Sequence, residues 1–219
     1  MENSISQVKV KLHDEPSLIR GLIIIYSVGL IGHLIPSTLS LMKWLTPFVL
    51  LISGLMALIP LRKEQQVSFW IWCGSIFIIT FIVEVIGITT DAVFGSYEYR
   101  ATLGPRLWNV PIIIGGVWLM VIVGAIRLTQ RIGNTALFLF AVGILVVLFD
   151  FFLEPVATDL DYWEWNSQNV PLQNYAVWFS IGAVSAVAYR VLRLSLKSLI
   201  PLSYFVIQVI FFAVLRLFL

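Results

Sequence analysis

Residues 134–154 read NTALFLFAVGILVVLFDFFLE, and this stretch decides the fold. Positions 135–149 carry no charged side chain, and most of them are aliphatic or aromatic. A helix of roughly 20 such residues crosses the hydrocarbon core of a bilayer, which is about 30 Å thick. A membrane-spanning strand would alternate polar and apolar residues, and this run does not alternate. The stretch therefore predicts a transmembrane helix.

The composition of the whole chain extends this conclusion. Of 219 residues, 59% are hydrophobic and only 12% are charged, which is too little charge to coat a soluble domain of this size. The sequence predicts an all-α integral membrane protein with about seven transmembrane helices. These form a single domain, residues 18–219, after a polar cytoplasmic segment, residues 1–17. The predicted spans are 18–37, 42–61, 68–91, 107–127, 134–154, 171–192 and 198–218.

The basic residues predict the orientation, because short cytoplasmic loops carry an excess of lysine and arginine. With a cytoplasmic N-terminus, 10 of the 14 basic residues fall on the inner side and 4 on the outer side. The inner set is Lys9, Lys11, Arg20, Arg62, Lys63, Arg127, Arg131, Arg190, Arg193 and Lys197, and the outer set is Lys43, Arg100, Arg106 and Arg216. We therefore expect an N-in, C-out, multi-pass protein of the inner (cytoplasmic) cell membrane, surrounded by the lipid bilayer. The net charge of +2 is too small and too scattered to predict a nucleic-acid partner.

A weak internal repeat runs through the middle of the chain. Two Asn-Val-Pro motifs, at 109–111 and 169–171, are each followed seven positions after the proline by a tryptophan, Trp118 and Trp178. Upstream of each motif lies an aromatic-acid-aromatic triplet, at 97–99 and 163–165. The repeat predicts that the third and fourth spans and the fifth and sixth spans are parallel copies. Their loops would then open on the same face and place related residues around one cavity.

Four acidic residues interrupt the apolar spans. A charged side chain at the centre of a transmembrane helix costs roughly 2.5–3.5 kcal/mol, so a fold keeps such residues where they are partnered or functional. Glu84 lies deep in the third span, and Asp91 follows two turns later on the same face. Asp150 and Glu154 are four residues apart in the fifth span. Crowded carboxylates away from water cannot all ionise, so we expect at least one of these candidate catalytic acids to hold a proton.

Each acid also has a structural interpretation. Glu84 would pair with Arg100 or Arg106, or hydrogen-bond helix backbones, and Asp91 would lie in the loop that follows the third span.

Aromatic residues crowd the loops beside these acids. One interpretation is an interfacial belt, since tryptophan and tyrosine favour the headgroup level of a membrane. The other is a slot for a flat apolar ligand, whose walls stabilise a cation through their π-faces. For Asn174, hydrogen bonding between helices is a further alternative. The candidate substrate-binding residues are Phe94, Tyr97, Tyr99, Trp108, Tyr162, Trp163, Trp165, Asn174 and Trp178.

The sequence carries no pattern for a metal or a cofactor. His33 lies alone in the first span and His13 in the polar segment, so the His-rich site of a membrane di-iron oxygenase is not available. P-loop and dinucleotide-binding glycine patterns are absent. We therefore expect the protein to use neither a metal nor an organic cofactor.

Two stretches of the chain resemble the signature of one family. The first is 84–99, EVIGITTDAVFGSYEY, followed by Leu103-Gly104 and Val110-Pro111. The second is 150–157, DFFLEPVA, with DYWEW at 161–165 and PLQNY at 171–175. Both resemble the membrane family of carotenoid biosynthesis that includes the carotenoid 1,2-hydratases, one branch of which hydrates bisanhydrobacterioruberin. The outer spans match this family only in being apolar.

This resemblance implies the addition of water to the terminal C1–C2 double bond of a ψ-end carotenoid, such as lycopene, γ-carotene or a bisanhydrobacterioruberin-like compound. Glu84 or Asp150, as a neutral acid, would protonate C2, and carboxylates and aromatic faces would stabilise the cation at C1. Glu154 would position the attacking water, with Tyr97 or Tyr99 as an alternative. The family pattern has glycine where this chain has Asp91, which weakens Asp91 as a shared catalytic group.

Two other functions fit the same residues. A carotenoid cyclase would form the same cation and then close a ring instead of admitting water. A proton-coupled transporter of small molecules would use the buried carboxylates and leave carotenoids unchanged. For an enzyme of this family, we expect the carotenoid substrate and other enzymes of the pathway as partners.

Overall fold

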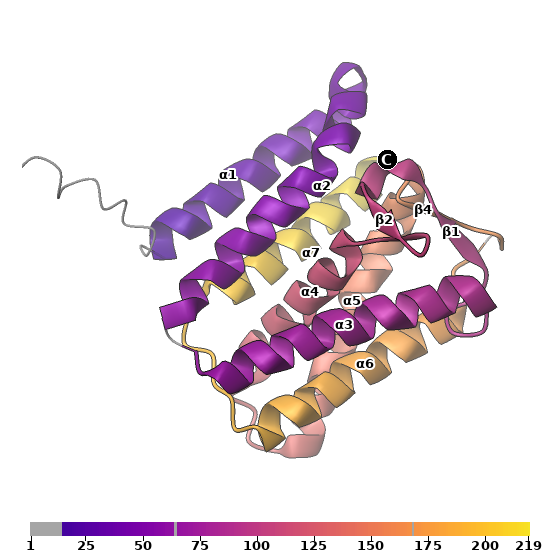
Figure 1. Ribbon diagram of the computed structural model, residues 1–219. Coiled ribbons are helices and arrows are strands. Elements are labelled where there is room, and N and C mark those ends of the chain that lie inside the picture. The colour runs from indigo at the N-terminus through magenta and orange to yellow at the C-terminus, as the bar shows by residue number, and fades with distance from the viewer. Residues whose placement is uncertain (1–14, 64, 168) are drawn as a thin grey trace, which may run out of the picture.

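The computed structural model describes residues 15–63, 65–167 and 169–219, which form a bundle of seven α-helices (Figure 1). Of the predicted polar segment 1–17, residues 1–14 lie outside the described residues, and residues 15–17 belong to the first helix. The 3-10 helix η1 (Ile59–Lys63) extends the second helix. The helices are α1 (Glu15–Leu34), α2 (Pro36–Leu58), α3 (Val67–Thr90), α4 (Ile113–Thr129), α5 (Thr135–Asp159), α6 (Leu172–Val191) and α7 (Ile200–Phe218).

Five of the described helices are long and apolar enough to cross a bilayer, namely α1, α2 with its 3-10 extension, α3, α5 and α7. The chain is therefore an integral membrane protein of helices, as the composition predicts. The expectation of seven spans is confirmed for these five. With 17 residues, α4 is about 25 Å long, and α6 is less apolar than the other helices; that these two also cross the bilayer stays a prediction.

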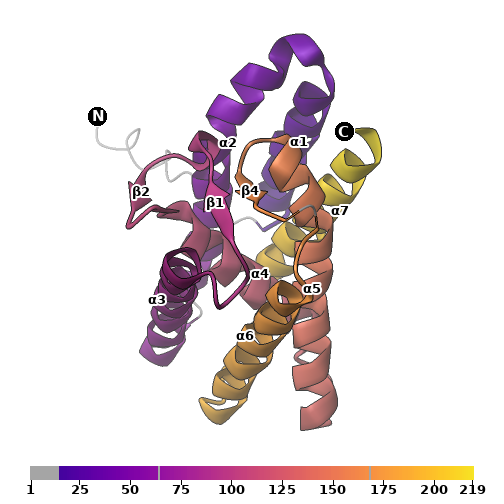
Figure 2. The ribbon, with the colours of Figure 1, turned by 90° about the vertical axis from the view of Figure 1, so that its right-hand side faces the viewer.

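Helix α4 lies in the middle of the bundle, where it contacts α2, α3, α5, α6 and α7 (Figures 1 and 2). Thirteen of its 17 residues are buried. Two glycines let its neighbours approach closely: a Cβ at Gly124 would collide with Phe205 of α7, and one at Gly115 would lie 2.9 Å from the carbonyl oxygen of Phe77 in α3. Small residues at such crossings permit close helix packing in lipid, where no hydrophobic effect drives helices together.

Short strands close one end of the bundle. β1 (Tyr97–Tyr99) pairs antiparallel with β4 (Trp163–Trp165), so the two aromatic triplets of the sequence repeat lie side by side (Figure 2). This confirms that the two loops meet on the same side. A second pair, β2 (Arg106–Leu107) and β3 (Val110–Pro111), forms a small hairpin before α4, and the 3-10 turn η2 (Ala101–Leu103) connects β1 to it.

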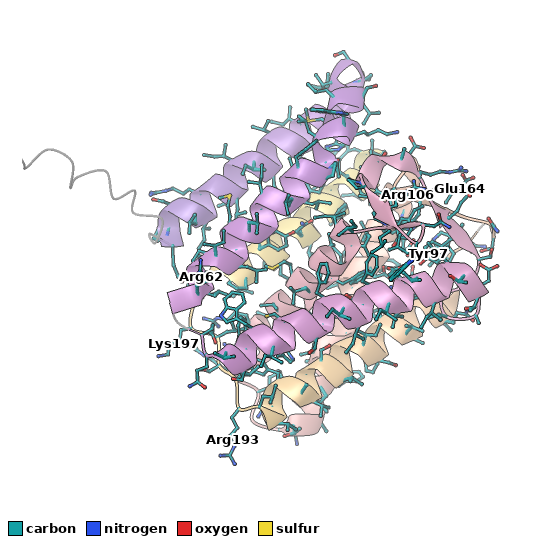
Figure 3. The ribbon with its side chains drawn as sticks, viewed as in Figure 1. Arg62, Tyr97, Arg106, Glu164, Arg193 and Lys197 are labelled. Carbon is teal, nitrogen blue, oxygen red and sulfur yellow. The ribbon has the colours of Figure 1, made fainter. Side chains whose placement is uncertain are left out.

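The four basic residues labelled in Figure 3 fall into the two predicted groups. Figure 3 shows Arg62, Arg193 and Lys197 at one end of the bundle and Arg106 at the other, with Glu164. The first three were assigned to the inner side and Arg106 to the outer side. Which end faces the cytoplasm stays a prediction.

Three predicted span boundaries are wrong. The span expected to begin at 42 begins at Pro36, because proline fits the first turn of a helix. The span expected at 107–127 begins later, at Ile113, because residues 106–111 form the β2–β3 hairpin, whose turn residues Trp108 and Asn109 both have positive φ. The span expected to stop before Pro155 continues to Asp159. Proline lacks the N–H that would bond to the carbonyl oxygen of Phe151, four residues earlier, and normally breaks a helix there.

Arg216 of α7 compensates for that proline. Its Nη1 donates a hydrogen bond of 2.7 Å to the carbonyl oxygen of Phe151, and its guanidinium lies 4.0 Å from the centre of the Phe151 ring. In lipid, an unpaired carbonyl group costs several kcal/mol, so a donor from another helix stabilises the continued turn. Glu154 lies on that turn, so Arg216 also supports the position of Glu154.

We expect Arg216→Met to lower the free energy of unfolding in detergent by about 1–3 kcal/mol, because the Phe151 carbonyl loses its donor. In Pro155→Ala the residue at 155 regains an N–H that bonds to Phe151, so the double variant Pro155→Ala, Arg216→Met should recover most of the loss. Thermal unfolding of the three variants measures both effects. Equal losses in the single Arg216 variant and the double variant would contradict this interpretation.

Candidate active site

Glu84 of α3 is 4% exposed and lies among hydrogen-bond donors. Its Oε2 accepts a hydrogen bond from the Tyr97 hydroxyl, and its Oε1 accepts one of 3.2 Å from Nε1 of Trp118 on α4. The predicted alternative, a salt bridge to Arg100 or Arg106, is wrong for Arg100: that guanidinium pairs with Glu98 and Glu164 on the outer face of the β1–β4 pair. No ion pair of Arg106 is present among the described residues either.

Asp150 and Glu154 of α5 lie one turn apart and share the side-chain amide of Asn174 on α6. The Nδ2 atom of Asn174 lies 2.6 Å from Oδ2 of Asp150 and 3.1 Å from Oε1 of Glu154. An amide nitrogen carries two protons, so it donates to both carboxylates at once. Asn174 thus makes the interhelical hydrogen bonds expected of it, and it makes them to the candidate acids.

The two carboxylates differ in how fully they are hydrogen-bonded. Glu154 also accepts hydrogen bonds from Nε1 of Trp163, at 2.9 Å, and from Nε1 of Trp165, at 2.7 Å. These N–H groups are donors only, so they favour the ionised carboxylate. The Oδ1 atom of Asp150, by contrast, is fully buried and has no partner. Hydrogen bonding therefore favours the anion more at Glu154 than at Asp150, and Asp150 is the better suited of the two to carry a proton.

The β1–β4 pair supplies most of these donors. Tyr97 faces Trp165 and Tyr99 faces Trp163 in its register, and the alternation of a strand turns these rings inward and the glutamates between them outward. Outside, Glu98 and Glu164 are directly opposite each other, and Arg100 bonds to both. The strand pair is thus an aromatic cap over the three carboxylates.

The tryptophans of the sequence repeat form the inner wall. Trp118 of α4 and Trp178 of α6 are stacked with their ring centres 3.4 Å apart, and Phe94 stacks on the other side of Trp178 at 5.3 Å. Trp118 is not among the site residues predicted from the sequence. Its position in the repeat, equivalent to that of Trp178, was the signal that identifies it.

The cavity between these residues has a volume of about 10 Å³, which is at the lower limit for one water molecule. It is lined by Glu84, Phe94, Tyr97, Tyr99, Trp118, Asp150, Glu154, Trp163, Trp165, Asn174 and Trp178. Ten of the thirteen predicted site residues therefore lie together.

The phenols of the cap remain neutral donors. Burial raises the pKa of both Tyr97 and Tyr99 well above the ordinary value, and the neighbouring Glu84 raises it further. The Tyr97 hydroxyl donates a hydrogen bond to Glu84.

Three predicted site residues lie elsewhere. Asp91 caps α3 in the left-handed conformation (φ 56°) and is exposed, because the helix ends one residue before it and turns its side chain away. Trp108 is 66% exposed in the β2–β3 turn. Tyr162 is buried, but it lines a different cavity, between α1, α2 and α7. None of the three lines the carboxylate cavity, and their roles in catalysis or substrate binding stay predictions.

The fold and the site define a class: helical membrane proteins with buried carboxylates beneath an aromatic cap. Residues 43–219 match the family model described as "Carotenoid biosynthesis protein", so the chain belongs to this family, as the resemblance of the motifs predicts. It is 27% identical over 119 residues to the bisanhydrobacterioruberin hydratase of Haloarcula japonica, a match that covers 49% of this chain and 40% of that relative. No solved structure matches the chain.

We expect Asn174→Leu to lower the free energy of unfolding by about 1–3 kcal/mol, because two buried carboxylates then lose a donor. Ser180→Ala on the same helix is the matched control, since that hydroxyl bonds only to a backbone carbonyl of α6 and is exposed. Thermal unfolding in detergent compares the two. An Asn174 variant as stable as the Ser180 variant would contradict the bridging role of the amide.

Proposed function

We propose that this protein is a carotenoid hydratase of the cytoplasmic membrane, which adds water to the terminal C1–C2 double bond of a ψ-end carotenoid to give a tertiary alcohol. The observation that carries the proposal is the unequal hydrogen bonding of three buried carboxylates. Glu84 and Glu154 accept hydrogen bonds through both of their oxygens, whereas the third, Asp150, has a free oxygen on the shared cavity. The relative named as a hydratase supports the same reaction class.

The proposed reaction needs one acid, one base and a stabilised cation. The proton on Oδ1 of Asp150 is transferred to C2 as the electron pair of the double bond forms the C2–H bond, which leaves a tertiary cation at C1. The carboxylates of Glu84 and Glu154 and the rings of the aromatic cap stabilise that charge in a site without bulk water. A water oxygen bonds to C1 and gives its proton to Glu154, which returns a proton to Asp150 one turn away.

The small cavity bears on how the substrate enters. A volume of about 10 Å³ holds no carotenoid end group, so the cap or the helices beneath it must move apart for the end group to reach Asp150. Water occupies the same narrow space, and only a site that admits it produces the alcohol. A cyclase would exclude it and form a ring.

The polyene of the substrate requires a long apolar surface outside this cavity. A groove of about 930 Å³ between α2 and α4 offers one, with apolar side chains along its whole length. On α2 it runs from Lys43 to Leu58, about 22 Å at 1.5 Å per residue. One part of its wall, residues 101–105, begins two residues after Tyr99 of the cap. We place the polyene in this groove, with its end directed towards the cap; other enzymes of the pathway would deliver it through the membrane.

Expression in bacteria that accumulate lycopene or γ-carotene tests the reaction, with the pigments analysed by mass spectrometry. We expect a product heavier by one water, lowered about 100-fold or more in Asp150→Asn, which lacks the proton donor. Glu84→Gln and Glu154→Gln should also lose most activity. Glu98→Gln removes an exposed carboxylate of the cap and should stay active.

Other outcomes identify other functions. A cyclised product of unchanged mass indicates the cyclase, and unchanged pigments with solute flux in vesicles indicate the transporter. Full activity in all three site variants would overturn the acid mechanism.

Filling the groove tests where the polyene lies. A Cβ at Gly54 of α2 would come no closer than 4.0 Å to Met120, so Gly54→Leu fits without a backbone collision and occupies groove volume. We expect about tenfold less hydrated product at equal protein level in the membrane. Gly74→Leu, on an open face of α3 with no atom within 4 Å of the new Cβ, is the control. Equal product from both variants would place the polyene elsewhere.

A further inference from the structure

A second cavity, of about 290 Å³, lies between α1, α2 and α7. Most of its wall is aliphatic or aromatic, but His33 of α1 and Gln208 of α7 also line it. Both side chains are almost completely buried, at 6% and 1% exposed. Neither belongs to the carboxylate site, and nothing in the proposed reaction uses them.

The hydrogen bonds of His33 fix which of its ring nitrogens is free. Its Nδ1 lies 2.7 Å from the carbonyl oxygen of Gly29, and a carbonyl oxygen only accepts, so Nδ1 carries a proton. A neutral imidazole then has a bare acceptor at Nε2, and this atom has no partner. The edge of the Phe211 ring packs on the imidazole with 5.7 Å between ring centres, and offers no hydrogen bond.

Gln208 has a free acceptor of the same kind. Its Nε2 donates hydrogen bonds to the hydroxyls of Tyr26, at 2.7 Å, and Tyr204, at 2.8 Å, which uses both amide protons. With the amide in this orientation, Oε1 is an acceptor without a partner. Of the other polar groups of the wall, Thr46 donates to the carbonyl oxygen of Met42, and the Tyr162 hydroxyl is not among the buried atoms without a partner.

Among the described residues, three buried side-chain polar atoms lack a partner: Asp150 Oδ1, His33 Nε2 and Gln208 Oε1. The first lies in the carboxylate site, and the other two share this apolar cavity. A buried acceptor without a donor costs about 1–3 kcal/mol. The two acceptors in this cavity complement a ligand that brings a hydrogen-bond donor on an otherwise apolar body. A hydrocarbon lacks the donor, and a carboxylate would be repelled by the acceptors.

The cavity adjoins the carboxylate site. Tyr162 of its wall is the residue before Trp163 of the cap, and their ring centres are 6.2 Å apart. On the other side, Phe212 of its wall packs on Phe149, and Phe149 packs on Trp118 of the carboxylate site. One layer of aromatic rings therefore separates the two.

We propose that this cavity binds the hydroxyl-bearing end of an apolar molecule through His33 and Gln208, and that its occupant is the tertiary-alcohol end of a hydrated carotenoid. The identity of the occupant rests on the proposed function, whereas the preference for a hydroxyl donor rests on the cavity alone. The alcohol would then be bound one aromatic layer away from the carboxylates where it forms. This would remove the product from Asp150 and so oppose the reverse reaction, in which the alcohol loses water.

The test uses the whole protein in detergent micelles, labelled with ¹⁵N-histidine. The sequence has two histidines, so His13→Asn assigns the signals of His33. The probes are dihydromyrcenol, a short tertiary alcohol with the carbon skeleton of a hydrated ψ end, and citronellene, the related hydrocarbon. We expect dihydromyrcenol to shift the Nε2 resonance of His33 in a saturable manner and citronellene to leave it unchanged. His33→Phe, which keeps a ring and removes the acceptor, should weaken alcohol binding roughly 3- to 10-fold, the range that one neutral hydrogen bond supplies.

Several outcomes would overturn the proposal. Equal binding of the alcohol and the hydrocarbon would show that the acceptors of His33 and Gln208 do not contribute to binding. An Nε2 signal that is already hydrogen-bonded and does not respond to the alcohol would indicate a bound water only. Asp150→Asn separates this site from the catalytic one, since it should bind dihydromyrcenol normally. If the protein binds the alcohol but makes no hydrated product, the proposed function is overturned and the alcohol-binding role of the cavity stands. If the enzyme is active but does not bind the alcohol, only the alcohol-binding role of the cavity is overturned.

Discussion

The structure depends on one constraint: carboxylates withdrawn from water must find hydrogen-bond donors inside the protein. Lipid offers none, so the chain supplies them from tryptophan, tyrosine and asparagine side chains. The β1–β4 pair exists where two loops bring Tyr97, Trp163 and Trp165 over the acids, and α6 contributes Asn174 from the side. Helices, cap and aromatic stack are therefore held in register by the same few contacts that define the candidate active site.

The same constraint explains how the chemistry is divided among similar groups. Glu84 and Glu154 accept hydrogen bonds through both oxygens, whereas Asp150 accepts through one. Three carboxylates with one bound proton form a site that both donates a proton and stabilises the cation that results. The α2–α4 groove is suited to the apolar polyene, and the α1–α2–α7 cavity to a hydroxyl. Three environments of different polarity thus lie within one small bundle.

Much of this was predictable from local sequence patterns. Apolar runs gave the helices, the cost of acids in lipid pointed to Glu84, Asp150 and Glu154, and the repeated triplets indicated that two loops meet. What the sequence did not reveal depends on contacts between distant segments. Pro155 predicts a helix end, but the helix continues to Asp159, and Arg216, 61 residues later, bonds to the carbonyl group that the proline cannot reach. Asp91 has the right spacing for the site but lies just past the last helical residue, where the backbone reverses.

The proton on Asp150 is the central claim, and infrared difference spectroscopy of the purified protein in H₂O and D₂O measures it directly. A protonated carboxyl group has a carbonyl stretching band that is separate from the bands of ionised carboxylates and shifts on deuteration. We expect this band at neutral pH in the unmodified protein, in Glu84→Gln and in Glu154→Gln, and its loss in Asp150→Asn. A spectrum without the band, or a band that persists in Asp150→Asn, would contradict the account.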